Sequence, residues 1–226
     1  MPLVVAVHGT HRTAESTRDS LAEFAERAGV AVLAPLFPAG LGGPNELNDY
    51  KEVAAGGVRY DEVLLAMIDE AAERWSLDTA RVVVSGYSGG GQFALRFTLL
   101  HADRVRAASI GAPGRVTLLD DEPWPHGIGD TPLVFGRPVD LDALRAVDLQ
   151  VVVGGLDDSS ELLAAVASDP REARAGAGRR DRAAFLASTL EARGLNVRLD
   201  IVPAVAHEAA GVLPEVIKFL EETLST

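Results

Sequence analysis

Short runs of apolar residues alternate with longer stretches of mixed polarity along almost the whole chain. The runs are nearly continuous in Val, Ile, Leu and Ala and do not alternate apolar with polar positions. That pattern is typical of parallel strands that are covered on both faces. The sequence therefore predicts buried strands over residues 3–7, 30–34, 81–85, 105–110, 150–153 and 196–202.

The stretches between these runs show helical spacing. In one of them, Val63, Leu64, Met67, Ile68 and Ala71 recur three or four residues apart, so one stripe of the helix would face the sheet. Alternation of strands and helices indicates right-handed βαβ units and a mostly parallel sheet with helices on both faces. We expect one α/β domain over residues 1–226, with helices over 16–28, 60–75, 90–101, 141–146, 159–168, 180–193 and 214–224.

Two segments interrupt this alternation. Residues 35–57 and 111–138 are rich in proline and glycine and carry only weak helix or strand signals. We call them the first and second rim segments, because each directly follows a predicted strand. In an open α/β sheet, ligands bind beyond the carboxyl ends of the strands. Both segments are therefore expected to border a binding site, and neither is long enough for a separate cap domain.

Composition and charge exclude several classes of partner and of chemistry. The chain has 47% hydrophobic and 24% charged residues, an ordinary globular composition, and its net charge is 21 − 33 = −12. An acidic chain is repelled by phosphate backbones and anionic membranes, so we expect no nucleic-acid and no membrane partner. The apolar N-terminus lacks basic residues and is too short for a signal or a membrane span, which favours a cytoplasmic location. The chain has no cysteine, which excludes disulfides and thiolate nucleophiles.

The strongest local motif is Gly86-Tyr87-Ser88-Gly89-Gly90, which follows a predicted strand and precedes a predicted helix. It matches G-x-S-x-G, in which a serine nucleophile stands on a tight strand-to-helix turn. Glycines on both sides remove β-carbons that would clash in such a bend. The following helix directs its N-terminal N–H groups toward a developing oxyanion. A simple Gly/Ser turn is the alternative, and the neighbouring Ser85 indicates that a serine alone carries little information.

On this motif the chain resembles the α/β-hydrolases over nearly its whole length. It resembles more narrowly the compact bacterial esterases similar to polyhydroxybutyrate depolymerases. The narrower resemblance is carried by Val7-His8-Gly9-Thr10, Leu33-Ala34-Pro35-Leu36-Phe37-Pro38 and Gly86-Tyr87-Ser88-Gly89-Gly90-Gly91-Gln92-Phe93. It implies an α/β-hydrolase fold without a separate cap domain, and a serine esterase that needs no cofactor.

The resemblance also implies an acid and a histidine after the serine, in that order. The acid follows the penultimate strand, where Gly154-Gly155-Leu156-Asp157-Asp158 offers two candidates; the family's G-x-x-D spacing counted from Gly154 favours Asp157. A helix cap is the alternative role for this acidic pair. His207 follows the last strand and precedes the final helix, which is where the family places its general base. The predicted catalytic residues are therefore Ser88, Asp157 and His207.

The turn His8-Gly9-Thr10-His11 follows the first strand. In the family such a turn supplies one oxyanion-hole N–H, and the residue after the nucleophile supplies the other. This assigns the two donors to Thr10 and Gly89 and a bracing role to His8. His8 and His11 lack a nearby carboxylate or cysteine, so we predict no metal. Candidate pocket residues are His11, Tyr87, Trp124 and His126.

Taken together, these residues predict a serine hydrolase that cleaves a small carboxylic ester, thioester or lactone through an acyl-enzyme on Ser88. Two alternatives stay open: the same residues serving a perhydrolase, carbon–carbon hydrolase, lyase or cyclase, and a non-catalytic binding protein with this fold. The substrate and the oligomeric state are left open too. One further set of residues is predicted to form a solvated helix face and not an anion site: Arg171, Arg174, Arg179, Arg180 and Arg182.

Overall fold

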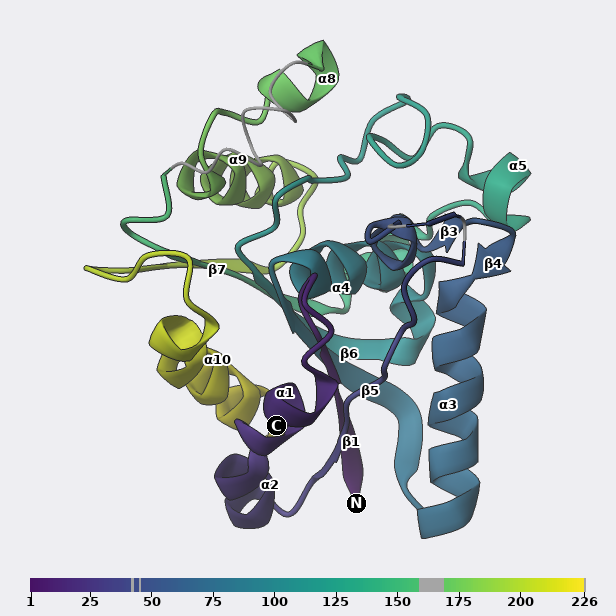
Figure 1. The fold of residues 1–226 in the computed structure, drawn as a ribbon, viewed down its shortest axis with the longest axis vertical. Coiled ribbons are helices and arrows are strands. Elements are labelled where there is room, and N and C mark those ends of the chain that lie inside the picture. The colour runs from purple at the N-terminus through teal and green to yellow at the C-terminus, as the bar shows by residue number, and fades with distance from the viewer. Residues whose placement is uncertain (42, 45, 159–168, 226) are drawn as a thin grey trace.

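The computed structural model describes residues 1–41, 43–44, 46–158 and 169–225. Its centre is a parallel sheet of six strands in the order β2-β1-β5-β6-β7-β8 (Figure 1). All six predicted strands are confirmed, with ends that differ by a few residues. Their bounds are β1 Pro2–Val7, β2 Ala31–Leu33, β5 Asp78–Tyr87, β6 Val105–Gly111, β7 Asp148–Gly154 and β8 Val197–Val202.

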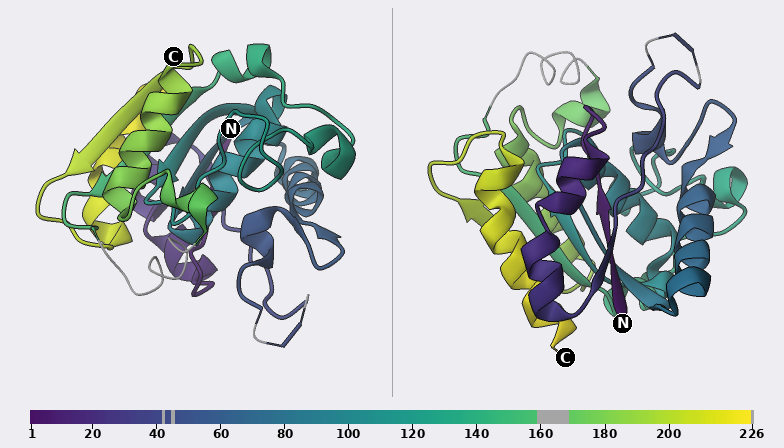
Figure 2. Two further views of the ribbon diagram at one scale, coloured as in Figure 1. Left: turned by 90° about the horizontal axis from the view of Figure 1, so that it is seen from above. Right: turned by 60° about the horizontal axis from the view of Figure 1, so that its bottom comes forward.

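Helices cover both faces of the sheet, as predicted. One face packs against α3 (Tyr60–Trp75), α4 (Gly89–Leu100) and α9 (Arg179–Glu191) around the larger apolar cluster. The other face packs against α2 (Ala22–Ala28) and α10 (Ala209–Leu224), which lie side by side (Figure 2). Within the described residues, no helix is long and apolar enough to cross a membrane.

Two of the helical segments differ from the sequence prediction, and a third is not tested. The helix expected over 16–28 is split into α1 (Ala14–Asp19) and α2, because the chain turns at Ser20 and Leu21. The last helix begins at Ala209, five residues before the predicted start, and contains Pro214 within it. The helix expected over 159–168 lies outside the described residues. The short helix α6 (Leu141–Arg145) agrees with prediction.

The two rim segments contain more regular structure than the sequence indicated. The first holds a short 3-10 helix, η1 (Asp49–Glu52), and strand β3 (Ala54–Ala55), which pairs antiparallel with β4 (Val58–Arg59). The second holds α5 (Thr131–Phe135). Two further short helices are η2 (Ala102–Arg104) and α8 (Pro170–Ala173). Such elements are too short to leave a periodic pattern in the sequence.

The strand order creates a switch point between β1 and β5. The chain leaves β1 to form β2 on one side and returns to form β5 on the other, with Val7 paired to Gly86. At such a point the connections that follow the two strands diverge and leave a crevice at the carboxyl edge of the sheet. The turn after β1 and the turn after β5 meet there, and these are the turns that carry Thr10 and Ser88.

Candidate active site

Ser88 is the residue between the end of β5 and the start of α4, and its backbone conformation is strained. Its φ of 58° and ψ of −115° lie in a region that non-glycine residues rarely adopt, and it occupies the N-cap position of α4. Its N–H donates to the carbonyl of Gly111 at 2.8 Å, which holds the turn on β6. A β-carbon on Gly86 would lie 2.2 Å from the Gly90 oxygen, so the tight turn requires glycine there.

Gly89 and Thr10, the two residues predicted to supply oxyanion donors, lie next to each other. A β-carbon built on Gly89 would stand 3.2 Å from Thr10 Oγ1, and still closer to the Tyr50 hydroxyl and to Lys51 Cε. As the first residue of α4, Gly89 has an N–H without an acceptor inside the helix. The structure thus brings together the turn after β1, the start of α4 and helix η1.

Lys51 is a functional candidate that the sequence analysis missed. Its side chain is buried beside Gly89, and its Nζ donates to Asn48 Oδ1 at 2.7 Å. Burial lowers the pKa of Lys51 to about 8, and the positive charges of Arg12 and Arg115 lower it further against the opposing effect of Glu46 and Glu52. A single lysine in a loop-like segment belongs to no motif, so only packing could identify it.

His8 braces the turn after β1, as expected. It is fully buried; its Nε2 accepts from the Phe37 N–H at 3.1 Å and its Nδ1 donates to the Gly9 carbonyl at 2.8 Å. Burial lowers the pKa of His8 below its ordinary value, although the bond to Gly9 acts in the opposite direction. A neutral imidazole with its proton on Nδ1 fits both hydrogen bonds. His8 therefore ties the first rim segment to the turn that carries Thr10.

Asp157 and His207, which are 50 residues apart in the chain, form a hydrogen bond. His207 Nδ1 lies 2.6 Å from Asp157 Oδ2 at the ends of β8 and β7. The Asp157 side chain is 1% exposed, whereas that of Asp158 is 51% exposed and pairs with Arg180 Nε at 3.1 Å. Of the two candidate acids, Asp157 is therefore the one that contacts the histidine. Its catalytic role stays a prediction.

Tyr87 connects this pair to the Ser88 turn. Its ring lies against that of His207 with the centroids 5.0 Å apart, and its hydroxyl is 3.5 Å from His207 Nδ1. Burial raises the pKa of Tyr87 well above its ordinary value, and the charge of Asp157 acts in the same direction. The hydroxyl therefore stays protonated, and the histidine lies beside the residue that precedes Ser88.

The other three candidate pocket residues lie in different surroundings. His11 is exposed in the turn after β1. Trp124 packs edge-on against Phe135, and its indole N–H donates to the Glu52 carbonyl at 2.8 Å. His126 Nδ1 lies 3.2 Å from the carboxylate of Glu172. These contacts connect the two rim segments to each other and to α8, and the assignment of the three residues to a substrate pocket stays a prediction.

The expectation that the basic run forms a solvated helix face is wrong at two positions. Arg179 and Arg182 are buried, although Arg171 and Arg174 are exposed as predicted. Arg182 Nη1 pairs with the buried Glu172 at 3.2 Å. Arg179 Nη1 lies 3.2 Å from Oδ1 of Asp157, the carboxylate oxygen that does not face His207. The two side chains turn inward because each finds a buried carboxylate, which compensates for the loss of hydration.

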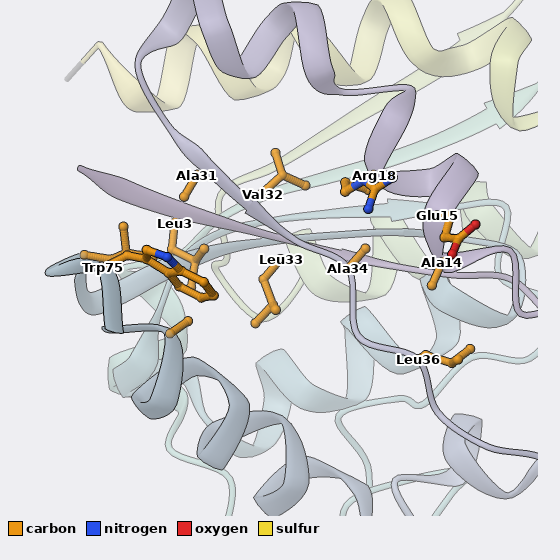
Figure 3. A pocket seen from close by; sticks show the side chains of 12 residues that line it. Leu3, Ala14, Glu15, Arg18, Ala31, Val32, Leu33, Ala34, Leu36 and Trp75 are labelled. Carbon is orange, nitrogen blue, oxygen red and sulfur yellow. The ribbon is translucent and has the colours of Figure 1, made fainter. Parts of the chain in front are cut away.

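An apolar groove on the surface does not coincide with these residues. A groove of about 400 Å³ runs beside the edge strand β2 and is lined by apolar side chains such as Leu33, Leu36 and Trp75 (Figure 3). Ser88, Asp157 and His207 are not among its lining residues. Within the described residues, no group of three or more His, Asp or Glu side chains is placed to hold a metal ion.

Comparison with solved structures identifies the fold. LpqC, a poly(3-hydroxybutyrate) depolymerase from Bordetella parapertussis, matches with a TM-score of 0.76 and 22% identity over 97% of this chain and 78% of its own. Poly(aspartic acid) hydrolase-1 from Sphingomonas sp. KT-1 matches with a TM-score of 0.72 and 21% identity, over 96% and 87%. FphF, a fluorophosphonate-binding serine hydrolase of Staphylococcus aureus, matches with a TM-score of 0.64 and 15% identity, over 99% and 84%.

No protein-family model and no curated protein match the sequence. The chain has the α/β-hydrolase fold, as predicted, and the structures it resembles across nearly its whole length include hydrolases and esterases. Identities near 20% establish a shared fold and leave the chemistry to be argued from the site itself.

Proposed function

We propose that this protein is a serine hydrolase that cleaves a small carboxylic ester, thioester or lactone through an acyl-enzyme on Ser88. The observation that carries the proposal is the 2.6 Å contact between His207 Nδ1 and Asp157 Oδ2, at the edge of the sheet where Ser88 stands in its strained turn. These are the residue types, in the chain order Ser, Asp, His, that nucleophilic acyl transfer uses in this fold.

The proposed reaction assigns tasks to each of these residues. His207 holds its Nδ1 proton on Asp157, which leaves Nε2 to accept the proton of the Ser88 hydroxyl as its oxygen attacks the substrate carbonyl. The negative charge that develops on the carbonyl oxygen is stabilised by the N–H groups of Thr10 and Gly89. His207 then returns the proton to the leaving group. In the second half, His207 takes a proton from a water molecule that attacks the acyl carbonyl, and it passes this proton to Ser88 Oγ as the bond between the acyl group and Ser88 breaks.

The first test replaces the nucleophile. Ser88→Ala is expected to lower kcat for short-chain p-nitrophenyl esters by several orders of magnitude and to abolish labelling by a fluorophosphonate probe. Ser85→Ala, which changes a serine three residues earlier, is the matched control and should keep both properties. Full esterase activity in Ser88→Ala would contradict the proposal. Absence of probe labelling in folded wild-type protein would favour a binding protein.

The second test separates the two neighbouring carboxylates. Asp157→Asn removes the acceptor of the His207 proton and is expected to lower kcat by about 10⁴. Asp158→Asn is expected to keep kcat within a few-fold of the wild type, because Asp158 is half exposed and pairs with Arg180. The two kcat values are compared by steady-state kinetics of both variants on the same ester. Equal losses in the two variants would contradict the assignment of Asp157.

A further inference from the structure

The carboxylate of Asp157 has a second buried partner besides His207. Arg179 Nη1 lies 3.2 Å from Oδ1, while His207 Nδ1 lies 2.6 Å from Oδ2. The side chains of Arg179 and Asp157 are 6% and 1% exposed, so water screens this ion pair little. One carboxylate therefore bridges a guanidinium that is always charged and an imidazole that changes its charge during the proposed reaction.

The backbone on both sides of the Arg179–Asp157 pair is held by close contacts between α9 and the loop after β7. Arg179 is the first residue of α9, and the N–H of the next residue, Arg180, donates to the Asp157 carbonyl at 3.2 Å. A β-carbon on Gly178 would lie 2.2 Å from the Asp158 oxygen, so the start of α9 packs directly on the loop that carries both acids. The helix thus fixes where the Arg179 guanidinium stands relative to the Asp157 carboxylate.

The charges around Asp157 and His207 come from several elements. Arg179 and Arg182 belong to α9, the neutral Tyr87 hydroxyl to β5, and Glu208 to the N-cap of α10. Of these groups, Arg179 is the cation in contact with the carboxylate that faces the histidine. A cation there attracts the carboxylate and also repels a proton from the histidine on its other side.

From this geometry we infer that Arg179 is a positioning residue of the Ser88 site. It fixes Asp157 so that Oδ2 faces His207, and its positive charge on the far side of the carboxylate offsets part of the attraction between Asp157 and a proton on His207. The inference rests on the proposed function, because it assigns Arg179 a task in the reaction of Ser88, Asp157 and His207.

The experiment compares Arg179→Gln and Arg179→Lys with Arg180→Gln. Arg180 is the matched control, because it is the next residue in the chain and its guanidinium contacts the half-exposed Asp158 and the Gly155 carbonyl. The kcat and KM for p-nitrophenyl acetate are measured from pH 5 to 9, and circular dichroism verifies that each variant is folded. The same Arg179 and Arg180 substitutions are also made in Ser88→Ala protein, where the His207 ring is titrated by NMR.

Arg179→Gln is expected to lower kcat at neutral pH by about 10-fold or more with little change in KM. The acid limb of its kcat–pH profile should move to higher pH by up to about one unit, because the carboxylate then holds a proton on His207 more strongly. Arg179→Lys keeps the charge but loses the planar guanidinium whose Nη1 contacts Oδ1, so it should lower kcat and leave the acid limb of the kcat–pH profile in place. Arg180→Gln should change neither quantity.

An Arg179→Gln enzyme that keeps the wild-type kcat and acid limb would overturn the inference, and so would a loss of kcat without any movement of the limb. If Arg179→Gln does not fold, an Arg179→Lys enzyme with the wild-type kcat would overturn it. The proposed function fails in a different way, through esterase activity that survives Ser88→Ala. In that case the His207 titration in Ser88→Ala protein still tests whether Arg179 controls the charge of the histidine.

Discussion

At the scale of single residues, Gly90 shows how closely the Ser88 turn approaches the sheet. A β-carbon on Gly90 would lie 2.1 Å from the Val7 oxygen and 2.9 Å from the His8 oxygen, both of them backbone atoms. Backbone atoms of a central strand cannot move aside, so α4 can approach β1 this closely only with glycine at that position. This close approach brings Gly89 to Thr10.

Gly90→Ala is therefore expected to destabilise the fold by about 1–3 kcal/mol or more, since the added methyl group overpacks a rigid contact. The control is Gly9→Ala, whose β-carbon would meet its nearest neighbour, the Tyr87 oxygen, at an ordinary 3.5 Å. Its cost should stay below about 1 kcal/mol. Urea unfolding followed by circular dichroism measures both values. Equal costs for the two variants would contradict this account of Gly90.

At the scale of elements, a buried charge cluster joins the start of α3 to the end of α4. Asp61 is fully buried; its carboxylate accepts from Arg59 Nε and Nη2 at 2.9 and 2.7 Å, and lies 2.9 Å from His101 Nε2. Burial alone would raise the pKa of Asp61, but the hydrogen bonds from His101 and Arg59 outweigh it and lower that pKa to about 2. The ionised carboxylate thus fixes how the two helices meet.

The lowered pKa determines how stability depends on pH. Because Asp61 loses its proton more readily in the folded state, its contribution is complete above its ordinary pKa of 3.8 and is lost as the pH falls toward 2. Asp61→Asn is expected to cost about 2–3 kcal/mol at pH 7, since it removes the buried carboxylate that accepts hydrogen bonds from Arg59 and contacts His101. Its difference from the wild type should shrink between pH 4 and pH 2.

Urea unfolding at a series of pH values measures this difference in the free energy of unfolding. The control is Asp69→Asn on the same helix, because the Asp69 side chain is 65% exposed in its pair with Arg104. This variant should cost less than about 1 kcal/mol at every pH. A cost of Asp61→Asn that stays constant down to pH 2 would contradict the role assigned to the ionised carboxylate.

At the scale of the whole molecule, one buried side chain on α4 holds both rim segments. Arg96 Nε donates to Thr117 Oγ1 at 2.9 Å, and Arg96 Nη1 donates to the Lys51 carbonyl. Nη2 also contacts the Pro125 carbonyl, at 3.5 Å. The same helix begins at the Ser88 turn, so Arg96 fixes both rim segments relative to the candidate nucleophile.

Arg96→Met is expected to lower the free energy of unfolding by about 2–4 kcal/mol, because the Lys51 carbonyl and Thr117 Oγ1 each lose a donor in a buried site. Amide hydrogen exchange should increase around residues 48–53 and 117–126 and stay unchanged in the central strands. Arg27→Met is the control, because Arg27 makes an ion pair with Glu221 in which both side chains are about half exposed. It should leave stability and exchange nearly unchanged. Exchange that increases uniformly over the protein would contradict this role of Arg96.

The sequence by itself determined the six strands, the covering of the sheet on both faces and the turn at Ser88. Each of these depends on a constraint that a few neighbouring residues express. A continuous apolar run must be buried on both faces, and glycines on both sides of a serine permit one kind of bend. Gly86 and Gly90 could therefore be identified before any contact was known. The contact of His207 with Asp157 agrees with a spacing taken from the resemblance, while the catalytic role of Asp157 stays a prediction.

Only the tertiary structure decided which charged groups are buried together. Arg179 and Arg182 lie in a polar run whose pattern predicts a solvated helix face. They turn inward because their buried partners, Asp157 and Glu172, lie 22 and 10 residues away along the chain. The burial of Lys51 beside Gly89, and of Arg96 against both rim segments, likewise depends on packing and follows from no local pattern. The burial of a charge depends on the partner that compensates for lost hydration, and packing, not the local pattern, brings that partner near.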